Sequence, residues 1–316
     1  MCRVEKPLVF ITRRLALDPA RVLGPGIAVD QHDEEVPPPR PEFLRRVHDA
    51  AALLPILADR VDAEVLDAAP RLRIVANHAV GTDNVDVAAC TARGIWVTNT
   101  PGVLTESTAD LTMALILALA RRLREGEQLL RSGKWPGWAP TLLLGIELAG
   151  KTLGIFGYGR IGRAVARRAE GFGMRVLFSS RGGGVDFEEL LERSDVITIH
   201  APLTPETRHA FGPEQLLSMK RGALLVNTAR GAIVDEAALV AALNSGHLAG
   251  AALDVFEHEP QVHPALLGRN DVVLLPHLGS ATRETRARMA EVALSQVELV
   301  LRGERPTTAV NQVMRP

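Results

Sequence analysis

Cysteine is scarce in this sequence of 316 residues, where only Cys2 and Cys90 occur. Such distant cysteines give neither a disulfide framework nor the close spacing of a metal site. The first residues also lack the apolar core of a signal peptide. We therefore expect reduced thiols, no bound metal and a cytoplasmic protein.

Long apolar runs and an excess of charge of one sign are absent as well. The longest apolar stretch, from Leu111 to Ala120, is about half of what a membrane-spanning helix needs. The formal net charge is -1, and acidic residues are interleaved with the arginines. We therefore expect neither a membrane span nor nucleic acid as the main partner. Apart from Gly182–Gly184, interpreted as a flexible turn, we find no repeat or low-complexity tract.

The remaining composition is that of a globular protein, with 47% hydrophobic and 23% charged residues. The length favours two domains, and short apolar strands alternate with helical segments in both. This pattern predicts an α/β protein with two doubly wound parallel-sheet domains. We assign residues 1–99 plus 289–316 to a substrate-binding (lid) domain and residues 100–288 to a Rossmann dinucleotide-binding domain. A long helix over residues 283–302 is expected to return to the first domain.

Some elements are predicted with sharper bounds. Residues 18–41 are rich in proline and aspartate, and within them residues 37–41 are interpreted as loop, whereas residues 43–52 are interpreted as a helix. Ser107 and Asp110 resemble a capping box ahead of a helix over residues 111–122.

A glycine-rich turn, Gly157 to Gly162, has the spacing G-x-G-x-x-G. An apolar strand precedes it and a helix follows, which is the context of a dinucleotide-binding turn. Gly157 permits a tight turn, Gly159 lets a pyrophosphate approach the backbone, and Gly162 lets the helix pack on the strand. The helix N-terminus offers N–H groups to the anion. A glycine-rich turn without a ligand is the alternative for the motif alone, but its context favours the dinucleotide.

Three polar residues, Arg230, Glu259 and His277, each follow a predicted strand of the second domain. Ligands of open parallel sheets bind beyond the carboxyl ends of the strands. Arginine can hold an oxyanion with two hydrogen bonds, protonated histidine can donate to a carbonyl oxygen, and a carboxylate can orient that histidine. Each residue alone could be an ordinary surface or loop residue. Together they suit the reduction of a carbonyl beside a carboxylate.

Seven ordered motifs resemble those of the D-isomer-specific 2-hydroxyacid dehydrogenases over nearly the whole chain. They lie at residues 79–84, 104–110, 157–162, 202–207, 227–231, 253–260 and 276–281. The nearest resemblance within the family is to glyoxylate/hydroxypyruvate reductases, including those that also take 2-ketogluconate. It implies hydride transfer between a nicotinamide dinucleotide and a small 2-oxoacid or 2-hydroxyacid, in the cleft between two domains.

The same resemblance implies roles for individual residues. His277 would be the acid/base, Glu259 its partner and Arg230 the substrate clamp. The backbone N–H groups of Val80 and Gly81 would hold the substrate carboxylate, and Asp254 would meet the nicotinamide carboxamide. The full set of implied cofactor-binding residues is Thr108, Gly157, Gly159, Arg160, Ile161, Ser179, Ser180, Arg181, Pro202, Thr207, Thr228, Ala229, Arg230, Asp254, His277 and Gly279.

The second Rossmann strand departs from the pattern of NAD-preferring members, which end it with an acidic residue. Here it ends in Ser179, Ser180 and Arg181, with no acid. An acid at this place accepts hydrogen bonds from the ribose hydroxyls of NAD and repels a 2′-phosphate. We therefore predict that NADP(H) is preferred and that NAD(H) is possible. The alternative is a solvated Arg181 and an indifferent site.

Two other functions stay open at this point. The chain could be a phosphoglycerate, D-lactate, 2-ketogluconate, phosphite or formate dehydrogenase of the same family. The loop with Trp135 and Trp138 is somewhat similar to that of phosphite dehydrogenase, whereas phosphoglycerate enzymes often carry a regulatory domain that we do not expect here. The chain could also be a dinucleotide-sensing binding protein of the same fold, although such proteins usually have disordered tails.

A homodimer is the expected assembly. The helix from Leu111 to Ala120 is apolar nearly all round, and a tryptophan-rich loop follows it. A monomer would expose a larger apolar patch there than soluble monomers usually tolerate. We further expect Trp138 to reach the active site of the partner and to limit substrate size.

Overall fold

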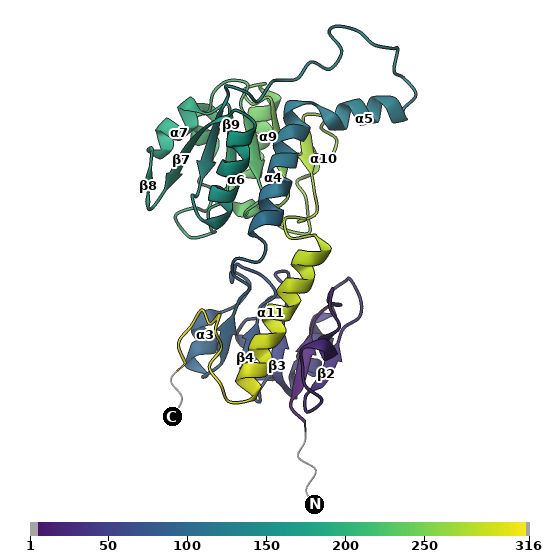
Figure 1. The fold of residues 1–316 in the computed structure, drawn as a ribbon, viewed down its shortest axis with the longest axis vertical. Helices are drawn as coiled ribbons and strands as arrows, with labels where there is room; N and C mark the ends of the chain where they lie inside the picture. The colour runs from purple at the N-terminus through teal and green to yellow at the C-terminus, as the bar shows by residue number, and fades with distance from the viewer. Residues whose placement is uncertain (1–5, 314–316) are drawn as a thin grey trace, which may run out of the picture. The chain divides into compact units, whose positions relative to one another are not determined.

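Parallel sheets covered by helices make up both halves of the chain in the structure, a computed structural model that describes residues 6–313 (Figure 1). One unit runs to Leu104 and resumes at Ala281, and the other is Thr105–Ser280. The domain boundaries predicted at residues 99 and 288 stay predictions. Cys2 lies outside the described residues.

The first unit contains a five-stranded parallel sheet in the order β2-β1-β3-β4-β5. Its strands are β1 (Leu8–Ile11), β2 (Ala28–Gln31), β3 (Ala50–Leu54), β4 (Ile74–Ala76) and β5 (Trp96–Thr98). Its helices are the 3-10 helix η1 (Pro19–Arg21), α1 (Arg40–Val47), α2 (Ala63–Ala68), α3 (Val87–Ala92) and α11 (Arg283–Leu301).

Alternation along β1 shows how the sheet is covered on both faces. Phe10 packs in one apolar cluster with residues of α1, α2 and α3, whereas Val9 and Ile11 pack in another with residues of α11. The long C-terminal helix therefore belongs to the core of the first sheet, as expected.

Two predictions for this unit are wrong. The helix expected over residues 43–52 ends at Val47, and Ala50–Leu54 is strand β3. Helices cover both faces of this sheet, so β3 is a continuous apolar run without the alternation that marks a half-exposed strand. The loop expected over residues 37–41 ends at Pro39, because α1 begins at Arg40. The proline- and aspartate-rich residues before it also contain β2, an edge strand that pairs with β1 and has an exposed Val29.

The second unit contains a seven-stranded sheet in the order β12-β11-β10-β9-β6-β7-β8. The pairs are parallel except β7 with β8. The strands are β6 (Thr152–Phe156), β7 (Arg175–Ser180), β8 (Gly183–Gly184), β9 (Val196–Ile199), β10 (Leu224–Asn227), β11 (Gly250–Leu253) and β12 (Val272–Leu274).

Helices cover both faces of this sheet too. Residues of α4 and α6 share one apolar cluster, and residues of α7, α8 and α9 share the other. The helices are α4 (Thr105–Ala120), α5 (Leu123–Arg131), α6 (Arg160–Gly171), α7 (Phe187–Arg193), α8 (Pro213–Ser218), the 3-10 helix η2 (Gly231–Ile233), α9 (Glu236–Asn244) and α10 (Pro264–Leu267). The prediction of two doubly wound α/β folds, one of them a Rossmann fold, is confirmed.

Two local predictions for the second unit are wrong, and one helix was not predicted. Because α4 begins at Thr105, Ser107 and Asp110 lie inside the helix and form no capping box. Gly183–Gly184 is strand β8 rather than a flexible turn. A separate helix, α5, follows α4, and in Figure 1 it and the loop after it extend away from the rest of the unit.

Cys90 is buried in the first core. Burial, assisted by the charge of Asp86, raises the pKa of its thiol to about 12. This thiol therefore stays protonated and unreactive at neutral pH. Across the helices of residues 6–313, none has the length and apolarity that crossing a membrane requires.

Candidate active site

The glycine-rich turn that follows β6 is sterically crowded. Gly157 has φ of 97°, and a Cβ there would lie 2.5 Å from the backbone nitrogen of Ala201. A Cβ on Gly162 would lie 2.3 Å from the carbonyl oxygen of Gly157, so α6 packs directly on the turn. Tyr158 stacks on Phe178 of β7 with ring centroids 3.9 Å apart. These contacts hold the turn against both neighbouring strands.

Gly159 differs from the other two glycines because open space surrounds the position of its missing Cβ. It is the N-cap of α6, it has no side chain to cap the helix, and the first turn carries no acidic residue. The N–H groups of the first turn, which include those of Arg160 and Ile161, are thus available to an anion. The turn fits the pyrophosphate of a dinucleotide.

His277 and Glu259 form a hydrogen-bonded pair. Nδ1 of His277 lies 3.0 Å from Oε2 of Glu259, whose Oε1 accepts from the N–H of Phe256 at 3.1 Å. Burial opposes ionisation of Glu259, but the hydrogen bond and charge of His277 outweigh it, assisted by Arg230, and lower the pKa of the carboxyl. An ionised Glu259 orients the ring and leaves Nε2 for proton transfer.

The backbone of His277 adopts a left-handed conformation, with φ of 54°. Its N–H donates to the carbonyl oxygen of Asp254 at 2.9 Å. The carboxylate of Asp254 accepts from the N–H groups of Leu278 and Gly279 at 2.6 and 2.8 Å. Burial raises the pKa of Asp254 although these N–H groups oppose the rise. Asp254 therefore anchors the loop that carries His277 in a conformation that is uncommon outside glycine.

Arg230 is positioned by a buried asparagine at the end of β10. Nδ2 of Asn227 donates to the carbonyl oxygen of Arg230 at 2.8 Å, and its Oδ1 accepts from the N–H of Ala229 at 3.0 Å. A Cβ on Gly231 would lie 1.8 Å from the carbonyl carbon of Phe256, so only glycine lets this loop pass so close to the loop of Glu259. Asn227 was not among the residues predicted for the site, although an asparagine that bonds to the backbone two residues on is a known turn signal.

Several predicted cofactor residues brace loops of the second unit with their own side chains. The hydroxyl of Thr108 donates to Gly279 O at 3.0 Å, and that of Thr207 donates to Pro202 O at 2.7 Å. The hydroxyl of Thr228 lies 3.0 Å from that of Thr112 in α4, and Ser180 donates to Gly183 O at 3.2 Å. These bonds shape the carboxyl edge of the sheet, and direct contacts with a cofactor stay a prediction.

The structure brings Arg230, Glu259 and His277 together within the second unit. Val80 and Gly81, the predicted carboxylate-binding residues, lie in the loop after β4 of the first unit. Nδ2 of Asn99 donates to the carbonyl oxygen of Val80 at 2.7 Å, and Nδ2 of Asn77 donates to that of Gly81 at 2.8 Å. The roles predicted for Val80 and Gly81 stay predictions.

Comparison with known proteins identifies relatives along nearly the whole chain. Residues 113–279 match the family "D-isomer specific 2-hydroxyacid dehydrogenase, NAD binding domain". A glyoxylate reductase of Korarchaeum cryptofilum is 50% identical over 321 residues, covering 97% of this chain and 96% of that protein.

Solved structures resemble the chain in both units. A protein from Thermus thermophilus is 50% identical, with a TM-score of 0.92 over 96% of this chain and 100% of that chain. An NADPH-dependent glyoxylate/hydroxypyruvate reductase of Sinorhizobium meliloti, solved with NADP and malonate, is 35% identical with a TM-score of 0.84. The match covers 99% of this chain and 100% of that chain.

Proposed function

The chain belongs to the D-isomer-specific 2-hydroxyacid dehydrogenase family, and we propose that it is a cytoplasmic, NADPH-preferring reductase of glyoxylate and hydroxypyruvate. The pairing of His277 with Glu259, beside Arg230, is the observation that carries this proposal. An oriented acid and a fork of guanidinium donors are what the reduction of a 2-oxoacid needs. Relatives named glyoxylate reductase support the substrate class.

In the proposed mechanism, the nicotinamide cofactor supplies the hydride when it is bound. Arg230 holds oxygens of the substrate with its guanidinium group, and the N–H groups of Val80 and Gly81 hold the carboxylate. His277 gives a proton from Nε2 to the carbonyl oxygen, while Glu259 keeps Nδ1 occupied and stabilises the positive ring. The product is glycolate from glyoxylate and the D-2-hydroxyacid from hydroxypyruvate.

A substrate panel tests this function. Glyoxylate, hydroxypyruvate, pyruvate, 2-ketogluconate, phosphite, formate and D-3-phosphoglycerate are compared by kcat/KM with both cofactors. We expect the highest values for glyoxylate or hydroxypyruvate with NADPH. A higher kcat/KM for phosphite, formate, pyruvate or D-3-phosphoglycerate would assign the chain to another activity of its family.

Cofactor preference is expected to depend on Arg181. In this structure Ser180 donates its hydroxyl to Gly183, so the exposed Arg181 at the turn of the hairpin is the main donor for a 2′-phosphate. A charged hydrogen bond contributes about 1.5–3 kcal/mol. This corresponds to a kcat/KM roughly ten- to a hundredfold higher for NADPH than for NADH. Arg181→Ala should remove most of this preference and leave NADH activity nearly unchanged.

Ser180→Asp is the matched variant, since its carboxylate would accept from the ribose hydroxyls and repel a 2′-phosphate. We expect it to reverse the preference. Equal kcat/KM for NADPH and NADH in the unaltered enzyme would contradict the proposed preference.

We propose a homodimer formed through α5 and the loop that follows it, and not through the helix Leu111–Ala120, because residues such as Ile116 and Leu119 of that helix are buried in the core of the second unit. Trp138 is 84% exposed, and Leu130 and Trp135 are exposed in the same segment, which extends from the second unit in Figure 1. Apolar side chains gathered on such an extension favour burial against another copy. Sedimentation at micromolar concentration should give a species of twice 34.1 kDa. A single species of 34.1 kDa would overturn the dimer, and an unaltered substrate profile in Trp138→Ala would exclude its role in substrate size.

A further inference from the structure

The loop that carries Val80 and Gly81 is held through its carbonyl groups. Ala79 O accepts from the N–H of Thr100 at 2.9 Å, and Val80 O accepts from Nδ2 of Asn99 at 2.7 Å. Gly81 O accepts from Nδ2 of Asn77 at 2.8 Å. Three successive carbonyls are thus bound to groups that follow β4 and β5.

The N–H groups of the same peptides are available. In a trans peptide the N–H points away from the C=O, so fixing a carbonyl also fixes the direction of the next residue's N–H. Thr100 thereby sets the N–H of Val80, and Asn99 sets the N–H of Gly81. Across residues 6–313, no acceptor pairs with the N–H of Val80 or Gly81. Adjacent N–H groups without acceptors form an anion-binding concavity.

We propose that Asn99 is a positioning residue, which turns the N–H of Gly81 toward the carboxylate of the substrate, and that Asn77 fixes the peptide that follows. This inference rests on the proposed function, because it assigns the free N–H groups to the substrate of that reaction. Asn99 acts through the backbone and need not touch the substrate.

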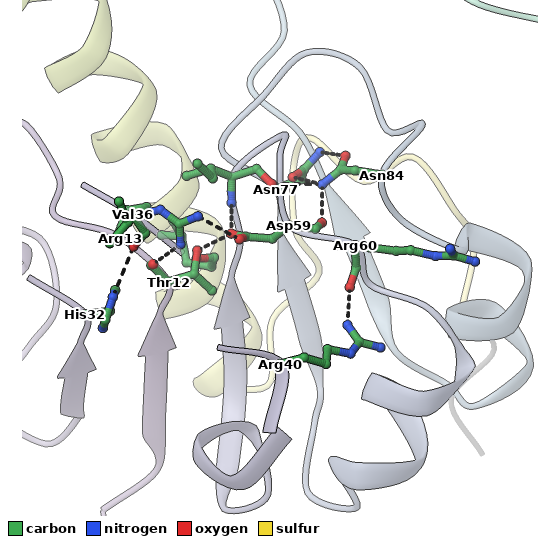
Figure 2. A network of polar contacts seen from close by, with 11 residues as sticks. Thr12, Arg13, His32, Val36, Arg40, Asp59, Arg60, Asn77 and Asn84 are labelled. Carbon is green, nitrogen blue, oxygen red and sulfur yellow. Dashed lines mark hydrogen bonds and ion pairs between the residues drawn. The ribbon is translucent and has the colours of Figure 1, made fainter. Parts of the chain in front are cut away.

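Asn77 is itself part of a buried network that gives the loop a rigid base (Figure 2). The amides of Asn77 and Asn84 pair with each other at 3.0 and 3.2 Å. Nδ2 of Asn84 also donates to the carbonyl oxygens of Ile56 and Asp59 at 3.0 and 3.1 Å. Figure 2 shows this chain of contacts running from Asn77 and Asn84 through Asp59 to Thr12, which directly follows β1.

An ion pair lies at the other end of the network. Arg13 and Asp59 are 6% and 5% exposed, and NH2 of Arg13 lies 3.2 Å from Oδ1 of Asp59. Oδ2 of Asp59 accepts from the N–H of Ile56 at 2.9 Å and from the hydroxyl of Thr12. Breaking a buried pair leaves an uncompensated charge and strongly destabilises the fold. Variants of this pair would therefore report on folding, and the half-buried Asn99 is the better test.

The decisive experiment uses oxalate, which presents carboxylates of the kind that glyoxylate carries, as a probe. Isothermal titration measures its binding to the full-length enzyme with NADP(H) bound. Asn99→Leu removes the donor with little change in size, and we expect oxalate affinity and the KM for glyoxylate to worsen about tenfold, as for the loss of one hydrogen bond. The KM for NADPH should not change.

Two further variants separate positioning from stability. Asn99→Asp keeps the shape, loses the donor and adds a repelling charge, so oxalate affinity should fall further than in Asn99→Leu. Asn311→Leu is the matched control, because the Asn311 amide also bonds to backbone groups. It accepts from the N–H of Val97 within β5 and donates to the carbonyl oxygen of Ile95 just before that strand, both at 2.9 Å. It should bind oxalate as the unaltered enzyme does.

Unchanged oxalate affinity in both Asn99 variants would overturn the inference, and so would an equal loss in Asn311→Leu. Failure of the unaltered enzyme to bind oxalate would overturn it as well. Turnover of glyoxylate by the unaltered enzyme is a separate result. If oxalate binds and depends on Asn99 but no 2-oxoacid is reduced, the proposed function fails and the carboxylate-binding role of the loop stands.

Discussion

His277→Ala is expected to lower kcat by about a hundredfold or more, because it removes the group that gives the proton to the carbonyl oxygen. The pairing of Nδ1 with Glu259 leaves Nε2 as the ring atom for this task. Steady-state reduction of glyoxylate with saturating NADPH measures the loss. The affinity for NADPH, measured by titration, should change little and serves as the control for folding. Near-normal turnover would exclude His277 as the acid.

The variant Glu259→Gln tests the partner in the same assay. Since the folded-state pKa of Glu259 is lowered, its bond to His277 is fully present above the ordinary glutamate value of about 4.3 and disappears only as pH falls through the lower folded value. Glutamine provides no charge beside the ring of His277, so kcat/KM should fall wherever Glu259 of the unaltered enzyme is ionised. The difference between the variant and the unaltered enzyme should shrink only as pH falls through the lowered pKa of Glu259, where the carboxyl group loses its charge as well. An identical profile with full activity would refute the role of Glu259.

Arg230→Ala is expected to raise KM and lower kcat, with a loss in kcat/KM of about a hundredfold or more. Two charged hydrogen bonds, each contributing about 1.5–3 kcal/mol, would be lost from groups that both bind the substrate and align its carbonyl. The two parameters should change together because positioning acts on both ground state and transition state. Steady-state kinetics with glyoxylate as the varied substrate measure both.

Arg230→Lys is the control for charge. Lysine keeps the positive charge but lacks the planar fork of donors, so we expect it to recover only a small part of the lost kcat/KM. Full recovery in Arg230→Lys would show that charge alone suffices and that no two-point clamp exists. An unaffected KM in Arg230→Ala would remove Arg230 from the substrate site.

The chain's local patterns were sufficient to predict which residues gather at the carboxyl edge of the second sheet. The spacing of Gly157, Gly159 and Gly162 has a steric meaning that does not depend on distant residues, and the structure shows crowded positions at the first and third glycines and an open position at the second. Arg230 and His277 follow strands of one parallel sheet, and carboxyl ends of such strands meet at one edge. Strand order was therefore not needed to expect them together.

Tertiary structure decided how those residues are held. His277 has a left-handed backbone, and its loop is anchored on Asp254, which lies in a different segment of the sequence. Gly231 likewise approaches Phe256 from a separate loop. Hydrophobic periodicity reports which side of an element is buried, but it carries no information on which loop lies beside another.

The same limit explains the missed elements and the role of Asn99. Strand β2 forms because β1 offers a free edge, and β8 forms because the chain turns back on β7. Neither short segment has an apolar pattern of its own. Asn99 matters through one bond to Val80, a residue 19 positions earlier, and only the folded loop brings its amide to that carbonyl. Residue types and spacing thus determined which chemistry is proposed for this protein, whereas long-range backbone contacts decided the geometry of the site.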